Sequence, residues 1–201
     1  MRVLAALLAG CLIALAIGIA QVSGARSSSS CGSERWAIKT MTDPMARLVD
    51  LQPRPTTVEA LRRLRAPALL GARRNRPVET TTYRVRARLL GFKTEADSDI
   101  HLVIAGLHTA GTMIVEFPLR ACVGQTPDGV RRKVSLARAA LVRWCGTPDS
   151  GFAALTGRAT ITGVGFFDFL HGQTGVAPNG IELHPVLGFV GACKRPPPPP
   201  A

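Results

Sequence analysis

The stretch between residues 168 and 184 holds the densest group of side chains that could do chemistry. Asp168 and His171 lie near its start, and Glu182 and His184 lie at its end. Glu182 and His184 are two residues apart, so in a strand their side chains share one face. Carboxylates and imidazoles together can bind a divalent metal such as zinc or manganese, and they can also transfer protons. All four residues are candidate metal ligands, and His171, Glu182 and His184 are candidate catalytic residues.

A second group of acidic and imidazole side chains comes earlier in the chain. Asp97, Asp99 and His101 alternate, so a strand would turn them to one side, and we expect Asp99 and His101 to contact a ligand. A structural role is the alternative for the first group, because Asp168 can cap a turn and His184 can bond a backbone carbonyl. The sequence contains no HExxH motif, which would indicate a metal site more directly.

Hydrophobic periodicity predicts the elements that must position these groups. From Thr80 to Phe92 apolar residues alternate with Arg84, Arg86 and Arg88, which is the period of a half-buried strand. Apolar residues recur at helical spacing up to Gly146, after a Thr-Pro-Asp start signal at residues 126–128. The other segments predict strands at 35–42, 99–105, 112–117, 158–168 and 181–190, and a short helix through about residue 65 capped by Thr56 or Thr57.

From residue 80 onward the order is three strands, one helix and two strands, which is the order of an OB-fold. The sequence therefore predicts a mainly β protein with one or two helices. We expect an OB-fold-like five-stranded barrel over residues 78–193, with an N-terminal extension at 35–77. The loops after the first and fourth barrel strands bracket the ligand face of such a fold, so both acidic groups are expected at one rim. Other small β-barrels and an α+β sandwich are the alternatives.

Arg84, Arg86 and Arg88 form a row of three cations on one strand face, and we expect them to bind a ligand. Such a row can follow a phosphate backbone. The net charge is +12, or +11 once Arg2 is removed with a signal peptide, and it favours an anionic polymer such as nucleic acid or a cell-envelope polymer. A solvated strand face is the alternative, because the few aromatic residues are expected to be buried rather than free to stack on bases.

The N-terminus has the three parts of a secretory signal. Met1 and Arg2 are followed by an apolar run over 3–20, and small residues at 23–25 predict cleavage after Ala25. Residues 1–25 are therefore expected to be removed, which leaves no transmembrane anchor, and 26–34 form a flexible leader. Residues 194–201 form a proline-rich tail. These features predict a protein that is secreted or held in the cell envelope.

Four cysteines follow the signal, namely Cys31, Cys122, Cys145 and Cys193. An even number of cysteines in an exported domain indicates two disulfides, and three pairings remain open. Zinc ligation is the alternative, but no two of these cysteines form a CxxC-type pair.

Three stretches carry a resemblance to a known family. They are CGSERWAIKTMTD from Cys31, ETTTYRVRARLLGFKTEADSDIHLVI from Glu79, and GVGFFDFLHGQTGVAPNGIELHPVL from Gly163. The chain resembles exported bacterial proteins of the actinobacterial type, over most of its length after the signal. The resemblance implies export and implies no particular activity.

These observations lead to three hypotheses of function. The first is a secreted small barrel protein that binds an anionic or polymeric ligand at its loop rim. The second is a metal-dependent hydrolase, such as a secreted nuclease, that uses a divalent metal. The third is a structural protein of the cell envelope. The identity of the ligand, the oligomeric state and the disulfide pairing stay open at this point.

Overall fold

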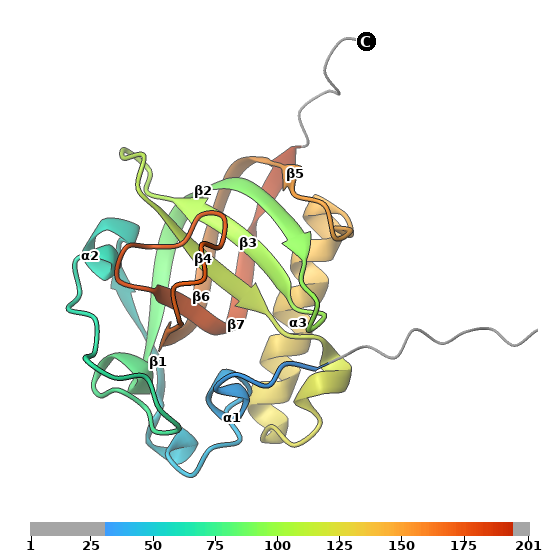
Figure 1. Cartoon of the computed structure of the whole chain (residues 1–201). Helices are drawn as coiled ribbons and strands as arrows, with labels where there is room; N and C mark the ends of the chain where they lie inside the picture. Colours follow the sequence, from blue (N-terminus) through green and yellow to red (C-terminus); the bar gives the residue numbers. More distant parts are fainter. Residues whose placement is uncertain (1–30, 195–201) are drawn as a thin grey trace, which may run out of the picture.

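A computed structural model describes residues 31–194. The expected signal, most of the leader and the tail from residue 195 lie outside the described residues. Five strands close a barrel (Figure 1): β2 (Thr81–Thr94), β3 (Ile100–Ala105), β4 (Thr112–Phe117), β6 (Thr156–Phe167) and β7 (Ile181–Lys194). They pair in the order β2-β3-β4-β7-β6, and β6 pairs again with β2. Only the β4–β7 pair within this ring is parallel. The predicted OB-fold-like barrel is confirmed.

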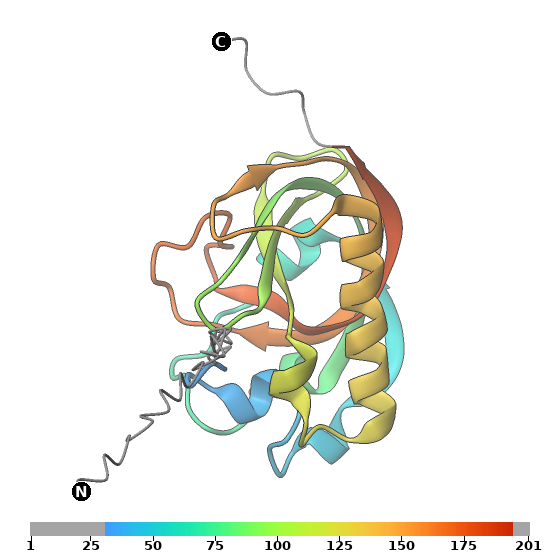
Figure 2. The ribbon, with the colours of Figure 1, turned by 90° about the vertical axis from the view of Figure 1, so that its right-hand side faces the viewer.

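Helix α3 (Asp128–Cys145) connects β4 to β6 and packs beside β7, where it flanks the barrel (Figure 2). The predicted periodicity is observed, because the side chains at 130, 134, 137 and 141 are buried. Thr126 does not cap the helix as expected. Its hydroxyl donates instead to the carbonyl of Thr40, and Pro127 occupies the N-cap position. This bond ties the start of α3 to the N-terminal extension.

The extension contains α1 (Trp36–Lys39), β1 (Asp50–Thr56) and α2 (Val58–Arg62), with a short 3₁₀ turn at Ala46–Leu48, and a second 3₁₀ turn at Val78–Thr80 leads into β2. The prediction of a strand at residues 35–42 is wrong. This segment forms α1 and a turn, because it lies against the outside of the barrel and buries Ile38 rather than pairing with a strand. β1 was not predicted, and it adds to the barrel by pairing in parallel with β2.

The barrel core is filled by the inward residues of each strand, as the period-two pattern of β2 predicted. A further short turn lies at Arg120–Val123, and the two-residue strand β5 (Ala153–Ala154) pairs with β2. Two disulfides form, Cys31–Cys122 and Cys145–Cys193, and they settle the pairing. Such bonds are typical of proteins from oxidising compartments. Among residues 31–194 no helix is long and apolar enough to cross a membrane.

Candidate metal centre

Three of the predicted residues, His101, Glu182 and His184, lie on the outer face of β3 and β7, while Asp97, Asp99, Asp168 and His171 lie in the adjoining loops. His101 pairs with Glu116 across β3 and β4, and Ile114 pairs with Glu182 across β4 and β7. Successive residues of a strand point to opposite faces, and the residues between these positions fill the barrel core. Glu182 and His184 therefore share the outer face of β7 and do not point into the apolar core.

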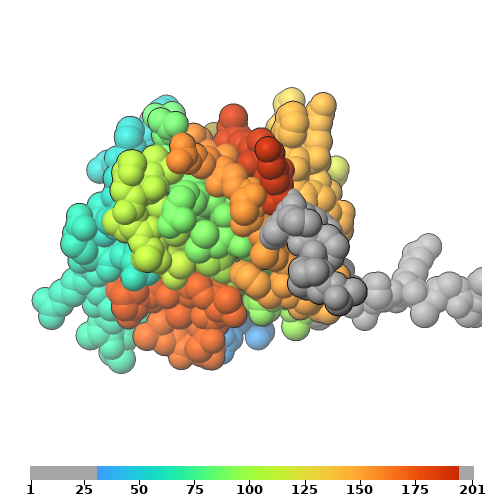
Figure 3. Space-filling view, turned by 90° about the horizontal axis from the view of Figure 1, so that it is seen from above, coloured from blue at the N-terminus to red at the C-terminus, as the bar shows by residue number. Residues whose placement is uncertain are grey.

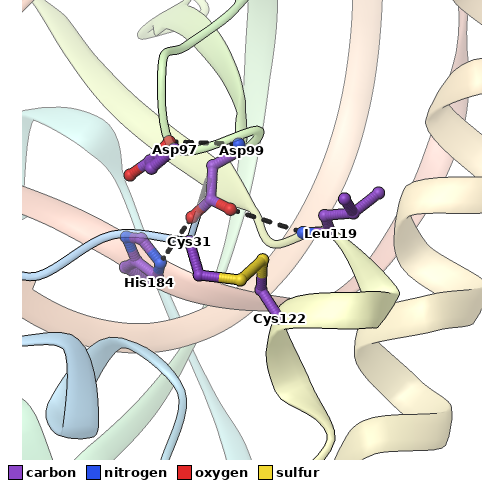
Figure 4. Close-up of a disulfide and its surroundings, with 6 residues drawn as sticks. All are labelled: Cys31, Asp97, Asp99, Leu119, Cys122 and His184. Carbon is purple, nitrogen blue, oxygen red and sulfur yellow. Dashed lines mark hydrogen bonds and ion pairs between the residues drawn. A yellow bond between two sulfur atoms is a disulfide. The ribbon is translucent and has the colours of Figure 1, made fainter. Parts of the chain in front are cut away.

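Two segments cover this outer face. Residues 31–43, from the end of the leader and the start of the extension, lie along it and are tethered by the Cys31–Cys122 disulfide (Figure 4). The loop between β6 and β7, residues 168–180, protrudes from the barrel surface and is coloured orange-red in the space-filling view (Figure 3). The carbonyl of Thr174 in this loop accepts a hydrogen bond of 2.9 Å from Nε2 of His101. These two segments shield Glu182 from solvent, which explains why it is only 2% exposed although it lies outside the barrel core.

An open pocket of about 410 Å³ remains between the covering segments and the strands. It lies between the β2–β3 and β6–β7 loops, which are the two loops that the sequence placed at one rim. Six carboxylates, two imidazoles and one ammonium line it: Glu34, Glu95, Asp97, Glu116, Asp168, Glu182, His101, His171 and Lys39. The pocket is therefore acidic, and it suits a cation better than the anionic ligand expected at the rim.

His101 is held as a cation at one side of the pocket. Its Nδ1 lies 3.0 Å from Glu116 and 3.2 Å from Glu95, and its Nε2 faces a carbonyl, so both ring nitrogens donate. Burial opposes the charge, but the hydrogen bonds to Glu116 and Glu95 outweigh it and raise the pKa of His101 to about 10. The hydrogen bond from His101 in turn lowers the pKa of Glu95 to about 2.

Lys39 enters the other side of the pocket from α1. Its ammonium lies 3.1 Å from Asp168. Burial opposes the charge, but the attraction of Asp168, Glu182 and Glu116 raises the pKa of Lys39. Burial also raises the pKa of Glu182 well above its usual range, and the charges of Glu116 and Asp168 raise it further. One oxygen of Glu182, Oε2, is buried with no hydrogen-bond partner among the described residues.

A tighter cluster lies beneath the pocket and shares Glu116 with its lining. Asp99, Glu116 and His184 each offer a ligand atom, and these three atoms lie within 4.8 Å of one another. Asp99 accepts a hydrogen bond from the backbone of Leu119 through Oδ1, while its Oδ2 lies 3.3 Å from Nε2 of His184 (Figure 4). That contact falls outside hydrogen-bond geometry. Asp99 Oδ2 and both ring nitrogens of His184 are thus buried without a hydrogen-bond partner among the described residues.

Burial sets the protonation of this cluster. It lowers the pKa of His184 to about 4, with help from the positive charge of Lys39, so the imidazole is neutral at pH 7. Neutral imidazole is the form in which histidine binds metals. Burial also raises the pKa of Asp99 to about 6, so its carboxylate is ionised near neutral pH. Near neutral pH, the ionised carboxylate of Asp99 and the neutral imidazole of His184 therefore both have lone pairs available for a shared ligand.

The residues predicted from the sequence fall into two groups, one that lines the pocket and one that lies beneath it. Asp168, His171, Glu182 and His101 line the pocket together, while Asp99 and His184 belong to the cluster beneath it. His171 is about half exposed and lies 3.2 Å from Glu34 at the pocket mouth.

Sequence reasoning missed Glu116, Glu95 and Lys39. A signal for Glu116 existed, because it is a carboxylate inside the apolar run of β4. Nothing in the sequence pointed to Lys39, which reaches the pocket through the packing of α1.

The predicted arginine row lies elsewhere. Arg84 and Arg86 are exposed on the outer face of β2, and the residues that line the surface hollows beside them are not those of the acidic pocket. Arg88 is engaged in the fold, because it donates to the carbonyls of Gly106 and Thr109. The arginines therefore do not meet Asp99 and His101 at a common site.

Comparisons of the chain with protein-family models, with curated proteins and with solved structures found no match.

Proposed function

We propose that this protein is an exported metal-dependent hydrolase, with a zinc or manganese ion held by Asp99, Glu116 and His184. The observation that carries the proposal is the convergence of three buried ligand atoms within 4.8 Å beneath an open acidic pocket whose lining includes Glu116. Export is supported by the signal-like N-terminus and by the two disulfides.

The spacing of the donors supports a metal. Two ligands at about 2.0–2.1 Å from one tetrahedral ion lie roughly 3.4 Å apart. Asp99 Oδ2 and His184 Nε2 are already 3.3 Å apart. A buried polar atom without a partner costs about 1–3 kcal/mol, so orphaned atoms of Asp99 and His184 favour a ligand between them. One nitrogen and two carboxylates form a mixed donor set of the kind that zinc and manganese accept.

The number of donors supports catalysis over a purely structural site. Structural zinc sites are closed by four protein ligands, whereas catalytic sites use three and leave one position open. Glu116 belongs both to the cluster and to the pocket lining, so the open side faces the pocket. A metal held by these three residues would act as a Lewis acid and would supply hydroxide for ester hydrolysis near neutral pH. Glu182, on the same strand face as His184, has an unpartnered oxygen and a pKa raised well above its usual range, so its carboxyl group can hold and exchange a proton beside the pocket.

Isothermal titration of the purified exported protein with zinc and with manganese tests metal binding. We expect one site, and we expect Asp99→Asn, Glu116→Gln and His184→Gln each to weaken it more than tenfold, or by about 1.4 kcal/mol. Asp128→Asn and His108→Gln remove the same groups at exposed positions outside the pocket and should bind as the unchanged protein does. Circular dichroism shows which variants fold. Unaltered affinity in a folded cluster variant would contradict the metal site.

Hydrolysis is tested separately, with bis(p-nitrophenyl) phosphate as a phosphodiester and p-nitrophenyl acetate as a carboxylic ester. We expect metal-stimulated release of nitrophenolate from one of them, lost in Asp99→Asn and retained in Asp128→Asn. A protein that binds the metal tightly but hydrolyses neither ester would leave the metal site standing and contradict the enzyme.

A further inference from the structure

A row of unpaired guanidinium groups lies on the outer face of β2 and β6. Arg84 and Arg86 are exposed on β2, and Arg158 is exposed on β6, where it pairs in register with Arg88. None of Arg84, Arg86 and Arg158 has a carboxylate partner among residues 31–194. Guanidinium groups left without a counter-ion on one strand face are available to bind an anion.

The surroundings of this row add hydroxyl groups and little negative charge. Two adjoining hollows of about 570 and 180 Å³ share Arg86 and Thr160 in their linings. The one carboxylate in either lining is that of Glu59, and it already accepts a hydrogen bond from Thr109. Thr160 pairs in register with Arg86, so a hydroxyl donor stands beside the guanidinium. The face is therefore positive and rich in donors.

The spacing of the cations suits a linear polyanion. Residues two apart on a strand are roughly 7 Å apart, so the row from Arg84 to the Arg88–Arg158 pair spans about 14 Å. Neither hollow is lined by Phe, Tyr or Trp. Proteins that grip single strands stack bases on such rings, so this face offers contacts to a backbone rather than to unstacked bases.

We infer that this arginine face binds the phosphate backbone of a nucleic-acid duplex without reading its sequence. A duplex presents regularly spaced phosphates with its bases turned inward, which matches a row of guanidinium and hydroxyl donors without aromatic rings. The positive net charge of the chain supports attraction to such a polymer. The inference is independent of the metal centre, because the two sites share no lining residue.

Fluorescence anisotropy of a labelled duplex DNA, titrated with the exported protein, tests the inference. Three phosphate contacts predict a slope of about −2.7 in log affinity against log salt, which is a roughly 40-fold loss of affinity between 50 and 200 mM salt. The triple variant Arg84→Ala, Arg86→Ala, Arg158→Ala should lose that slope. The control triple Arg132→Ala, Lys133→Ala, Arg143→Ala removes the same charge from exposed positions on α3 and should retain it.

Equal loss of binding in both triple variants would show attraction to net charge alone and would overturn the assigned face. Tighter binding of polyglutamate or of a sulfated polysaccharide than of the duplex, with the same dependence on the three arginines, would overturn the nucleic-acid occupant. Stronger binding of oligothymidine than of the duplex would overturn the preference for paired strands.

Discussion

Replacement of Glu79 by glutamine should destabilise the fold strongly, although Glu79 touches neither the pocket nor the metal cluster. Its carboxylate is fully buried. It accepts two hydrogen bonds from Arg35, at 2.7 and 2.8 Å, two from Asn75, and one of 2.8 Å from the backbone of Phe167. These bonds join the start of the extension, the loop before β2 and the end of β6. Glu79 therefore anchors the extension that carries Lys39.

The size of the loss in stability follows from the charge of Arg35, which Glu79→Gln leaves without a counter-ion. The side chain of Arg35 is only 3% exposed, and Glu79→Gln removes its counter-ion. Removing one partner of a buried ion pair costs about 3–5 kcal/mol. Arg35 keeps its bonds to the carbonyls of Phe167, Gly71 and Arg73, so the lower end of that range applies, about 3 kcal/mol. A loss of this size is a large share of the roughly 5–15 kcal/mol that stabilises a domain.

Urea unfolding followed by circular dichroism at neutral pH measures the change. The matched control is Glu34→Gln, because Glu34 is exposed and its ion pair within residues 31–194 is the surface contact with His171, so its loss should stay below about 0.5 kcal/mol. A destabilisation of less than about 1 kcal/mol by Glu79→Gln would refute the argument that the buried charge of Arg35 depends on this carboxylate.

Two further predictions concern the Cys31–Cys122 disulfide and the ion pair between His101 and Glu95. The double variant Cys31→Ser, Cys122→Ser opens a loop of 91 residues, and loop-closure entropy predicts that the free energy of unfolding falls by about 4.6 kcal/mol. Urea unfolding of the variant and of the unchanged oxidised protein measures this fall. A fall below about 1 kcal/mol would contradict the stabilising role of the disulfide. The pKa of Glu95 is lowered from 4.5 to about 2, so its ionised form stabilises the fold at higher pH and that contribution is lost as pH falls from 4.5 through 2. Glu95→Gln should therefore flatten the pH dependence of unfolding in that window, and an unchanged profile would count against the His101–Glu95 bond.

The barrel could be predicted from the sequence because the hydrophobic periodicity within β2 and α3 indicates their type and their buried face. The alternation of Arg84, Arg86 and Arg88 with apolar residues fixed the inward face of β2, and helical spacing fixed α3. β1 could not be read in this way. It contains Pro53 and Pro55 and no period-two burial, and it forms only because β2 offers a parallel edge. Likewise, the helical conformation of α1 depends on its packing against the barrel and not on a hydrophobic periodicity of its own.

The candidate site was predictable in part for the same reason. Glu182 and His184 were correctly placed on one strand face, because parity is a local property. The contact of Asp99 with His184 depends on the long-range parallel pairing of β4 with β7, which brings the start of β3 near β7 across β4. The sequence placed both near one rim but did not reveal that Glu116 completes the cluster or that Lys39 neutralises part of the pocket.

Anomalous X-ray diffraction from crystals of the exported protein grown with zinc, recorded at the zinc absorption edge, would locate the metal proposed at Asp99, Glu116 and His184. We predict one strong anomalous peak, about 2.0–2.2 Å from a carboxylate oxygen of Asp99, one of Glu116 and a ring nitrogen of His184, and open to the pocket on its fourth side. A peak held by Asp168 and His171 at the pocket mouth, or no peak at the cluster under saturating zinc, would contradict this prediction.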